Sequence, residues 1–494
     1  MLFNSYQFLL FFPIVTILYY LLPHKYRWFH LLFASCFFYM FFIPVYILIL
    51  FFTIVIDYIA GIMLENAEGR RKYIYLVMSI VANVGILAFF KYYNFFVENV
   101  NDILRLTHSN AQIEFLKIAL PIGLSFHTFQ AMSYTIEVYR GNQKAERHFG
   151  IYALYVMFYP QLVAGPIERP QELLHQFHEE HKFNYDNVVC GLRQMMWGLF
   201  KKVVIADFLA TQIVDPIFMN PNGDKYTGIA LLLGLFCFSF QLYCDFSGYS
   251  DIARGAARVM GYQLMINFDR PFSSKSISEL WRRWHISLSS WFNDYVYNPT
   301  VGGLRNWGKT AVIFGLIFTF VLCGFWHGAA WKYVLFGLMQ GVAIAYEFLT
   351  RKRRRKIFGV LPQWLNNGLS RIITFVYFSI SLIFFRCINM KESLAYFKGI
   401  AGVGKDLAKG KIFNNVHGGV ITGRYFHIHN TDLFYAAFLL VLLEMLQMVH
   451  QKESMNTIIQ RQNWMVRWSL YTGLFFVFFL LGVYNNRQFI YFQF

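Results

Sequence analysis

The sequence predicts an all-α polytopic membrane protein. Of its 494 residues, 57% are hydrophobic, 20% are aromatic and only 14% are charged. A helix of roughly 17–25 apolar residues crosses a hydrocarbon core about 30 Å thick, and about eleven apolar runs of this kind recur along the chain. We therefore expect about eleven transmembrane helices together with shorter helices that do not cross the membrane.

The predicted transmembrane helices follow the order of the apolar runs. The first run lacks the basic region and the small-residue cleavage site of a secretory signal, so we expect it to be a span. Two further apolar stretches, 150–166 and 188–214, are interrupted by prolines or by charges such as Lys201 and Lys202. We expect re-entrant, interfacial or tilted helices there. The predicted spans lie near residues 6–22, 30–43, 45–64, 73–90, 118–138, 228–244, 310–326, 330–349, 370–388, 432–449 and 465–484.

The net charge of +17 fits a membrane location rather than a nucleic-acid-binding function. Lys and Arg gather between the apolar runs, as in loops that stay in the cytoplasm, so we expect membrane lipids and no nucleic acid as partners. The six cysteines form no Cys-x-x-Cys pattern. Neither a disulfide framework nor a bound metal is predicted.

No boundary of the kind that separates soluble domains is visible. We expect residues 1–494 to form a single membrane-embedded domain. Within it, the prediction places N-terminal spans in residues 1–100, a catalytic core in 118–349 and C-terminal spans in 370–494.

A polar motif follows the apolar run of residues 228–244. It places Asp245, Ser247 and Asp251 directly after that run. A carboxylate at the centre of a bilayer costs roughly 2.5–3.5 kcal/mol on insertion scales, so Asp245 should face protein or water. We interpret Asp245 and Ser247 as supports of an internal site.

Two histidines flank one predicted span. His285 precedes residues 310–326, and His327 follows them. Histidine is the side chain whose ordinary pKa makes it a base near neutral pH, and an ionisable group at membrane depth indicates function by default. We predict a route through the bilayer with one histidine at each mouth.

The basic run Arg351–Lys356 gives this route a direction. Short basic loops are retained in the cytoplasm, so a helix that descends to this run has its other end near the outer surface. The preceding span rises about 1.5 Å per residue and falls slightly short of a full hydrocarbon core. We therefore expect His327 recessed below the outer surface and His285 on the cytoplasmic side.

Each histidine also has a structural interpretation. A helical projection of residues 281–292, at about 100° per residue, places Trp281 and other aromatic residues on one face and His285 at its edge. That pattern is typical both of a functional imidazole and of an interfacial anchor. His327 beside Trp326 is equally typical of a hydrogen-bonded histidine in a closely packed hairpin. The residues alone leave these alternatives open.

Several longer motifs resemble the membrane-bound O-acyltransferase (MBOAT) family. The resemblance is greatest to its bacterial polysaccharide acetyltransferases, among them the membrane subunit of alginate O-acetyltransferase, and it covers nearly the whole chain. The motifs are Pro160–Ile167, Tyr243–Asp251, Asn267–Phe272, Trp281–Tyr297, Gly324–Trp331 and Phe489–Phe494.

The resemblance implies an MBOAT-like fold in which the helices enclose a central tunnel. It implies that His327 is the invariant catalytic histidine and that His285 is the second, more variable one. The residues expected to line the tunnel or to support the site are Trp281, Trp326, Asp245, Ser247 and Gln161.

The implied activity is O-acetylation of an exported polysaccharide such as alginate. The donor is expected to be acetyl-CoA or another acyl thioester, which docks on the cytoplasmic side, with no permanently bound cofactor. Guanidinium and ammonium groups suit its phosphates, and they suit lipid headgroups equally. The candidates for this contact are Arg282, Arg283, Arg270 and Lys275.

Similar acetyltransferases pass the acyl group to a secreted protein that resembles a serine esterase. This chain has no Gly-x-Ser-x-Gly motif of its own, so we expect such a partner outside a bacterial cytoplasmic (inner) membrane. The nearest alternative is D-alanyl transfer of the teichoic-acid type, with an acyl carrier protein as donor. A transporter or flippase is less favoured, because no inverted repeat with paired broken helices is evident.

Overall fold

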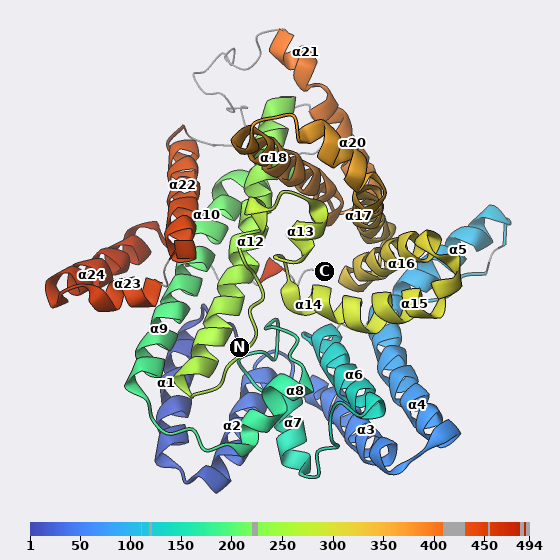
Figure 1. Cartoon of the computed structure of the whole chain (residues 1–494), viewed down its shortest axis with the longest axis vertical. Coiled ribbons are helices and arrows are strands. Elements are labelled where there is room, and N and C mark those ends of the chain that lie inside the picture. The colour runs from blue at the N-terminus through green and yellow to red at the C-terminus, as the bar shows by residue number, and fades with distance from the viewer. Residues whose placement is uncertain are drawn as a thin grey trace. The chain divides into compact units, whose positions relative to one another are not determined.

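The computed structural model of the chain is built of helices (Figure 1). It describes residues 1–109, 111–117, 121–219, 226–408, 430–452, 455–484 and 489–490. Over these residues no strand occurs, which confirms the all-α prediction. The chain forms two compact units. Unit 1 is Met1–Met196, Tyr249–Ile266 and Gly328–Ala330, and unit 2 is Trp197–Gly248, Asn267–His327 and Trp331–Phe494.

Unit 1 is organised around three helices that pack on one another, α3, α4 and α6. Their contact buries a polar cluster in which Asp57 of α3 accepts hydrogen bonds from Ser79 (2.6 Å) and Asn83 (2.8 Å) of α4. A buried carboxylate that is hydrogen-bonded in this way ties the helices together. The helices of unit 1 are α1 Tyr6–Leu21, α2 His24–Met40, α3 Ile47–Asn66, α4 Gly69–Leu87, α5 Tyr93–Leu106, α6 Leu124–Arg140, α7 Phe149–Met157 and α8 Pro170–Leu173.

Unit 2 is organised around the hairpin of α16 and α17, the helix pair with the most extensive contact. Gly324 and Gly337 face each other across it, and a side chain at either position would collide with the opposite backbone. The helices of unit 2 are α10 Asp207–Leu209, α11 Asp215–Phe218, α13 Ile277–Trp281, α14 Ile286–Phe292, α15 Asn298–Gly303, α16 Lys309–His327, α17 Trp331–Phe358, α18 Gln363–Ser381, α19 Ile383–Arg386, α20 Met390–Ala401, α21 Val403–Ala408, α22 Asn430–Lys452, α23 Met455–Arg461 and α24 Trp464–Leu481.

Two further helices, α9 (Tyr185–Leu199) and α12 (Gly228–Val259), contribute residues to both units. α9 continues through the π-helical segment Phe200–Ala206, which carries Lys201 and Lys202. α12 does not end at residue 244 as predicted. It continues through the polar motif, because the carboxylates and hydroxyls of that motif find partners inside the protein.

Eight helices of the described residues are long and apolar enough to cross a membrane. They account for eight of the predicted runs. The run at 6–22 forms the shorter apolar helix α1, the run at 30–43 lies in α2, and the run at 118–138 becomes α6, whose side chains are almost all buried by protein. The eight are Pro44–Asn66, Gly69–Leu106, Gly228–Val259, Lys309–His327, Trp331–Phe358, Gln363–Arg386, Thr431–Val449 and Trp464–Leu481.

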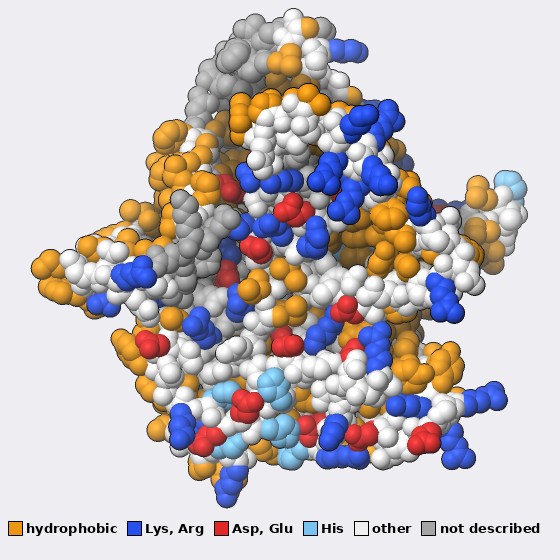
Figure 2. Space-filling model, viewed as in Figure 1, with side chains coloured by type: hydrophobic (Ala, Val, Ile, Leu, Met, Phe, Trp, Pro, Cys, Tyr) orange, Lys and Arg blue, Asp and Glu red, His pale blue; other side chains and the backbone are white. Residues whose placement is uncertain are grey.

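The outer surface of α24 shows why such helices need a membrane. None of its most apolar stretch is buried, and Figure 2 shows hydrophobic side chains over the part of the molecule that Figure 1 labels α24. Trp468, Phe475 and Phe479 are each more than half exposed. A contiguous apolar surface of this kind fits contact with lipid.

Candidate functional site

His285 lies in a sharp turn between two short helices of unit 2. α13 ends at Trp281 and α14 begins at Ile286, and Figure 1 shows the two as separate helices. His285 itself has φ 45° and ψ 53°, the left-handed region that non-glycine residues seldom adopt. The predicted continuous helix over residues 281–292 is therefore wrong. The turn exposes Arg282 and buries His285 completely, at 0% exposure.

The His285 ring is held by Asn267. Its Nδ1 lies 3.1 Å from Oδ1 of Asn267, and the same oxygen accepts hydrogen bonds from the Ser287 hydroxyl (2.9 Å) and main-chain N–H (3.2 Å). The ring of Phe246 meets the imidazole edge-on, with centroids 4.6 Å apart. Burial, with a smaller contribution from nearby His327, holds the pKa of His285 well below its usual range. The ring is therefore neutral near pH 7.

His327 ends α16 inside a shell of aromatic rings. Its side chain is buried, and its ring lies 5.2 Å from Phe385, 6.2 Å from Phe336 and 4.9 Å from Trp326. Nε2 of His327 is 4.0 Å from the thiol of Cys323, one helical turn earlier. Three aromatic rings and one thiol thus lie around the imidazole.

The two histidines share one site. The ring of His285 lies 6.3 Å from Trp326, and the ring of His327 lies 4.9 Å from the same indole. α16 has 19 residues and is roughly 28 Å long at 1.5 Å per residue, so histidines at its two ends could not both reach Trp326. The expected placement at two opposite mouths is wrong. Both imidazoles lie at the C-terminal end of α16.

Trp281 supports the same aromatic shell. Its indole N–H donates to Oε1 of Gln340 (3.1 Å), and the Gln340 amide donates to the Ser381 hydroxyl (2.8 Å). The ring of Phe336 lies 6.4 Å from Trp281 and 6.2 Å from His327. Trp281 and His327 thus share Phe336 as a neighbour.

Two buried lysines interact with Asp245 and Ser247. Lys202 pairs with Asp245 (2.7 Å) and with Asp207 (3.0 Å), and Lys201 donates to the Ser247 hydroxyl (2.9 Å). The second carboxylate oxygen of Asp245 accepts from the main-chain N–H of Ile490 (2.8 Å). These contacts are structural. They fix α12, whose Phe246 contacts His285 and, at 5.2 Å, Phe489 of the C-terminal motif. Residues 491–494 of that motif lie outside the described residues.

Gln161 belongs to unit 1. Its side chain is buried, and its amide donates to the carbonyl of Tyr155 (2.8 Å), which also accepts from Gln130 (2.6 Å). Within unit 1 the Gln161 amide ties the chain after α7 to the carbonyl of Tyr155 in α7, and Gln130 of α6 binds the same carbonyl. Its predicted tunnel role stays a prediction.

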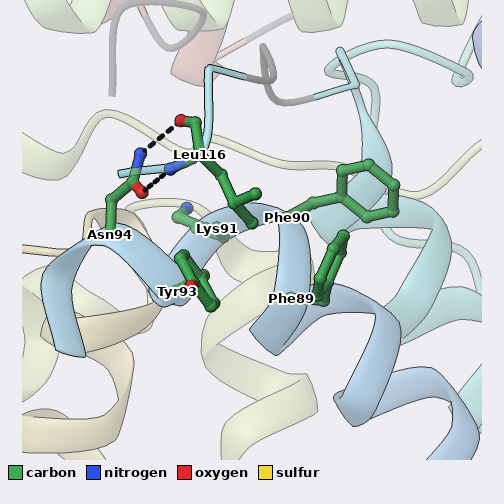
Figure 3. A pocket seen from close by; sticks show the side chains of 6 residues that line it. All are labelled: Phe89, Phe90, Lys91, Tyr93, Asn94 and Leu116. Atoms are coloured by element: carbon green, nitrogen blue, oxygen red, sulfur yellow. Dashed lines mark hydrogen bonds between the residues drawn. The ribbon is translucent and has the colours of Figure 1, made fainter. Parts of the chain in front are cut away.

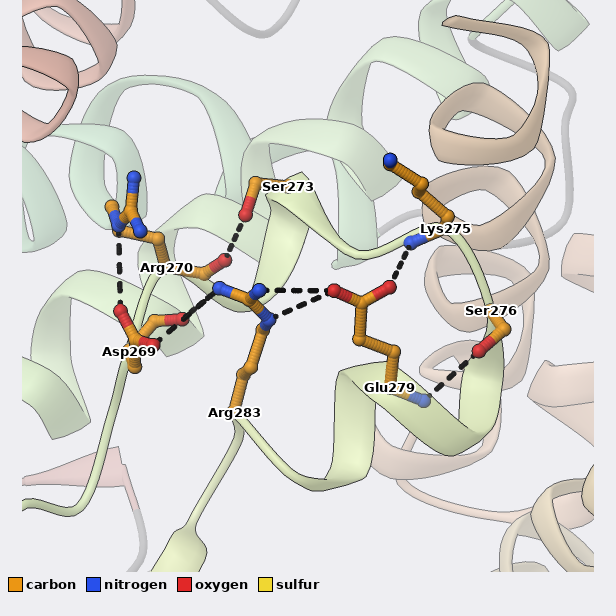
Figure 4. Close-up of polar contacts among 7 residues, drawn as sticks. All are labelled: Asp269, Arg270, Ser273, Lys275, Ser276, Glu279 and Arg283. Atoms are coloured by element: carbon orange, nitrogen blue, oxygen red, sulfur yellow. Dashed lines mark hydrogen bonds and ion pairs between the residues drawn. The ribbon is translucent and has the colours of Figure 1, made fainter. Parts of the chain in front are cut away.

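The four candidate phosphate contacts come from one short segment, residues 270–283. Figure 4 shows three of them, Arg270, Lys275 and Arg283. Arg270 pairs with Asp269 (3.4 Å), and Arg283 pairs with Asp269 (3.4 Å) and Glu279 (3.0 Å). The Lys275 side chain is exposed and points away from these pairs in Figure 4. Arg282 is also exposed. The segment runs directly into the turn that holds His285, so its cations lie near the site along the chain.

A surface pocket elsewhere in unit 1 contains none of the predicted site residues. It is lined by Phe89, Phe90, Lys91, Tyr93, Asn94 and Leu116 (Figure 3). The Asn94 side chain donates to the carbonyl of Leu116 (2.9 Å) and accepts from its N–H (2.8 Å). The pocket joins a loop to the helix that follows α4, and we assign it no catalytic role.

The site brings two imidazoles, which can accept and donate protons, close to one indole. Among the described residues, no group of three or more His, Cys, Asp or Glu could hold a metal ion. Sequence reasoning missed Asn267, Gln340 and the partners of the two lysines. Asn267 opens one of the motifs, two residues before Asp269, and a polar residue within a hydrophobic motif was the signal available.

Several known proteins are similar to this chain in sequence. A peptidoglycan O-acetyltransferase of Helicobacter pylori is 35% identical over 404 residues, 76% of this chain and 73% of the relative. A probable alginate O-acetylase of Pseudomonas aeruginosa is 37% identical over 412 residues, 82% and 75% of the two chains. A teichoic acid D-alanyltransferase of Streptococcus thermophilus is 30% identical over 285 residues, 53% and 67%.

A model of a whole protein family matches the part of the chain that holds the candidate site. Residues 147–390 match the membrane-bound O-acyltransferase family, and this range includes both histidines, Asn267 and the basic segment. Together with the multiple apolar helices, the comparisons confirm a multi-pass membrane enzyme that transfers acyl groups to oxygen. The chain belongs to the membrane-bound O-acyltransferase family.

Proposed function

We propose that this enzyme takes an acetyl group from a cytoplasmic acyl thioester, acetyl-CoA in the simplest case, and passes it across the membrane for O-acetylation of an exported polysaccharide. The observation that carries the proposal is the pair of buried imidazoles whose rings both lie close to Trp326. Two bases in an apolar shell suit a reaction in which a neutral hydroxyl must lose a proton.

In the proposed reaction, His327 takes the proton of the acceptor hydroxyl. The oxygen attacks the thioester carbonyl, a C–O bond forms, the C–S bond breaks, and the leaving thiolate receives the proton from the His327 imidazolium. The rings of Phe336, Phe385 and Trp326 exclude water from this step, which limits hydrolysis of the thioester.

The basic segment binds the donor in this proposal. Lys275 and Arg282 are exposed. The Lys275 ammonium offers a compact positive charge to phosphate, and the Arg282 guanidinium offers two parallel N–H donors. Because the segment ends at the His285 turn, a donor held by its phosphates can extend its thioester toward the histidines. Arg270 and Arg283 contribute after exchanging their carboxylate partners for phosphate.

The proposed class of acceptor is based on the names of the related proteins. Two of them are named for acetylation of peptidoglycan and alginate, polymers that differ in their sugars, so the acceptor is proposed only as an exported polysaccharide. The acyl group passes through a secreted partner that resembles a serine esterase. The location is a bacterial cytoplasmic (inner) membrane.

His327→Ala tests the proposal. General-base catalysis contributes roughly 10²–10⁴-fold, so acetyl transfer in membranes that contain the variant should fall below detection while the protein stays at normal abundance. The matched control is His175→Ala, an exposed histidine of unit 1, which should transfer acetyl groups like the wild type. Wild-type transfer by His327→Ala would refute the assignment.

The identity of the donor is tested separately. Turnover of acetyl-CoA by the purified enzyme supports acetylation. Activity that depends on an acylated carrier protein, with none from acetyl-CoA, would instead support the D-alanyl transfer for which the Streptococcus relative is named.

A further inference from the structure

Asn267 binds the His285 turn with its main chain and its side chain. Its carbonyl accepts from the N–H of Ile286 (2.9 Å), and Oδ1 accepts from Ser287. Two residues later, the N–H of Asp269 donates to the carbonyl of Arg283 (2.9 Å). Asn267 is 1% exposed, so these bonds are made out of contact with water, where they are worth most.

The atoms around Asn267 determine where the proton of His285 lies. The main-chain N–H of Ser287 can only donate, so the Asn267 atom that faces it is the oxygen and not the amide nitrogen. An oxygen of that amide can only accept. Nδ1 of His285, 3.1 Å from it, must therefore carry a hydrogen. A neutral imidazole has one N–H, so Nε2 carries the lone pair.

The backbone of the turn needs this support. A non-glycine residue in the left-handed region costs about 1–3 kcal/mol and persists where its surroundings impose it. His285 has φ 45°, and its two following residues are both held by Asn267. One residue thus supports the conformation of the turn, through its carbonyl and its side chain, and its side chain sets the tautomer of the ring.

We propose that Asn267 is the positioning residue of the acyl-transfer site, which fixes His285 in the Nδ1–H tautomer so that its Nε2 serves as a second acceptor for an O–H or S–H group of the substrates. The inference rests on the proposed function for the identity of those substrates. A neutral His285 of this tautomer has no Nε2–H and does not donate to the carbonyl oxygen of the donor. This distinguishes its role from that of an oxyanion-stabilising residue.

The first test is made on the resting protein and does not depend on activity. The full chain, labelled with ¹⁵N-histidine and reconstituted in lipid, is measured by NMR, and the His285 signals are assigned by their loss in His285→Phe. Protonated Nδ1 and unprotonated Nε2 are expected in the wild type and in Asn267→Asp. An Nε2–H tautomer in the wild type would overturn the inference and leave the proposed function standing.

The second test measures the pH profile of Asn267→Asp. A carboxylate keeps the acceptor but adds a negative charge about 3 Å from Nδ1, which raises the pKa of His285. His285 then stays protonated up to a higher pH, so the acidic limb of the kcat/KM profile should shift to higher pH. Nearby charged groups are common to both proteins: His327 on α16, Asp245 paired with Lys202 on α12, and Asp269 paired with its arginines.

Asn267→Leu and Ser287→Ala complete the series. Asn267→Leu removes the acceptor and should lower kcat about 10–100-fold, with KM for acetyl-CoA within about twofold. Ser287→Ala removes one hydrogen bond to Asn267 and the 3.5 Å contact of its hydroxyl with Nδ1 of His285, but it leaves the contact between Asn267 and His285. It should therefore retain the tautomer and, because it adds no charge, shift the pH profile less than Asn267→Asp. An unshifted profile in an abundant, active Asn267→Asp would show that Asn267 is merely structural.

Discussion

The two charged regions of unit 2 differ in how their charges are balanced. Lys202 and its partners Asp207 and Asp245 are at most 9% exposed. In the segment around α13, the side chains of Arg283 and Asp269 are 27% and 52% exposed. The first region is part of the fold, because an ion pair out of water persists only if its members remain together. The second can exchange its partners for a ligand.

The two regions are close in the sequence, and the difference in exposure suggests that they have different roles. The buried pair fixes α12, whose Phe246 contacts His285. The exposed segment leads directly along the chain into the turn that holds the same histidine. We propose that one region supports the base and that the other receives the donor. Figure 2 shows Lys and Arg side chains gathered over the part that Figure 1 labels α13, α17 and α18.

Asp245→Ala should produce the larger effect. It leaves Lys202 buried with one carboxylate and removes the acceptor for Ile490. Removing one partner of a buried pair costs about 3–5 kcal/mol, so the variant should lose most of its folded protein in detergent, measured by thermal unfolding followed by size-exclusion chromatography.

Asp269→Ala is the matched control for that experiment. It removes a carboxylate that pairs with two arginines on the surface, and an exposed pair contributes about 0–1 kcal/mol. Equal loss of folded protein in the two variants would contradict the distinction between the regions.

Lys275→Ala with Arg282→Ala should produce a smaller, purely kinetic effect. Each exposed cation contributes about 1 kcal/mol to a phosphate contact at low salt, so the double variant should raise KM for acetyl-CoA about 30-fold and leave kcat unchanged. Added salt should reduce the difference from the wild type, because surface charges are screened.

Lys405→Ala, an exposed lysine of α21, is the control for general loss of positive charge. It should leave KM unchanged. If the double variant kept its wild-type KM at low salt, the donor phosphates would have to bind elsewhere.

The sequence predicted the helices of the site better than its turns. The apolar run of α16 has the length of a span, so its bounds and the position of His327 at its end followed closely. The start of α17 was also predicted, but the helix continues to Phe358 and includes the basic run Arg351–Lys356, which was expected in a loop. The left-handed turn at His285 was not predicted, because a pattern of tryptophans and arginines fits a continuous helix equally well. Its cause is Asn267, eighteen residues earlier.

Long-range partners explain the other differences. α12 continues past residue 244 because Lys201 and Lys202 neutralise its polar motif from more than forty residues away. The expected separation of the histidines failed for a similar reason. Order along the chain placed them on two sides of a span, and packing brings His285 back to Trp326.

The central claim is that the two histidines act on one chemical step at one site. Its most direct test is to follow ¹⁴C-acetyl-CoA in His285→Ala and His327→Ala, and to measure donor consumption and acceptor labelling in the same samples. We expect the two quantities to fall together in each variant, with the larger loss in His327→Ala. Continued donor consumption by His327→Ala without acceptor labelling would show that the histidines serve separate steps and would contradict the account.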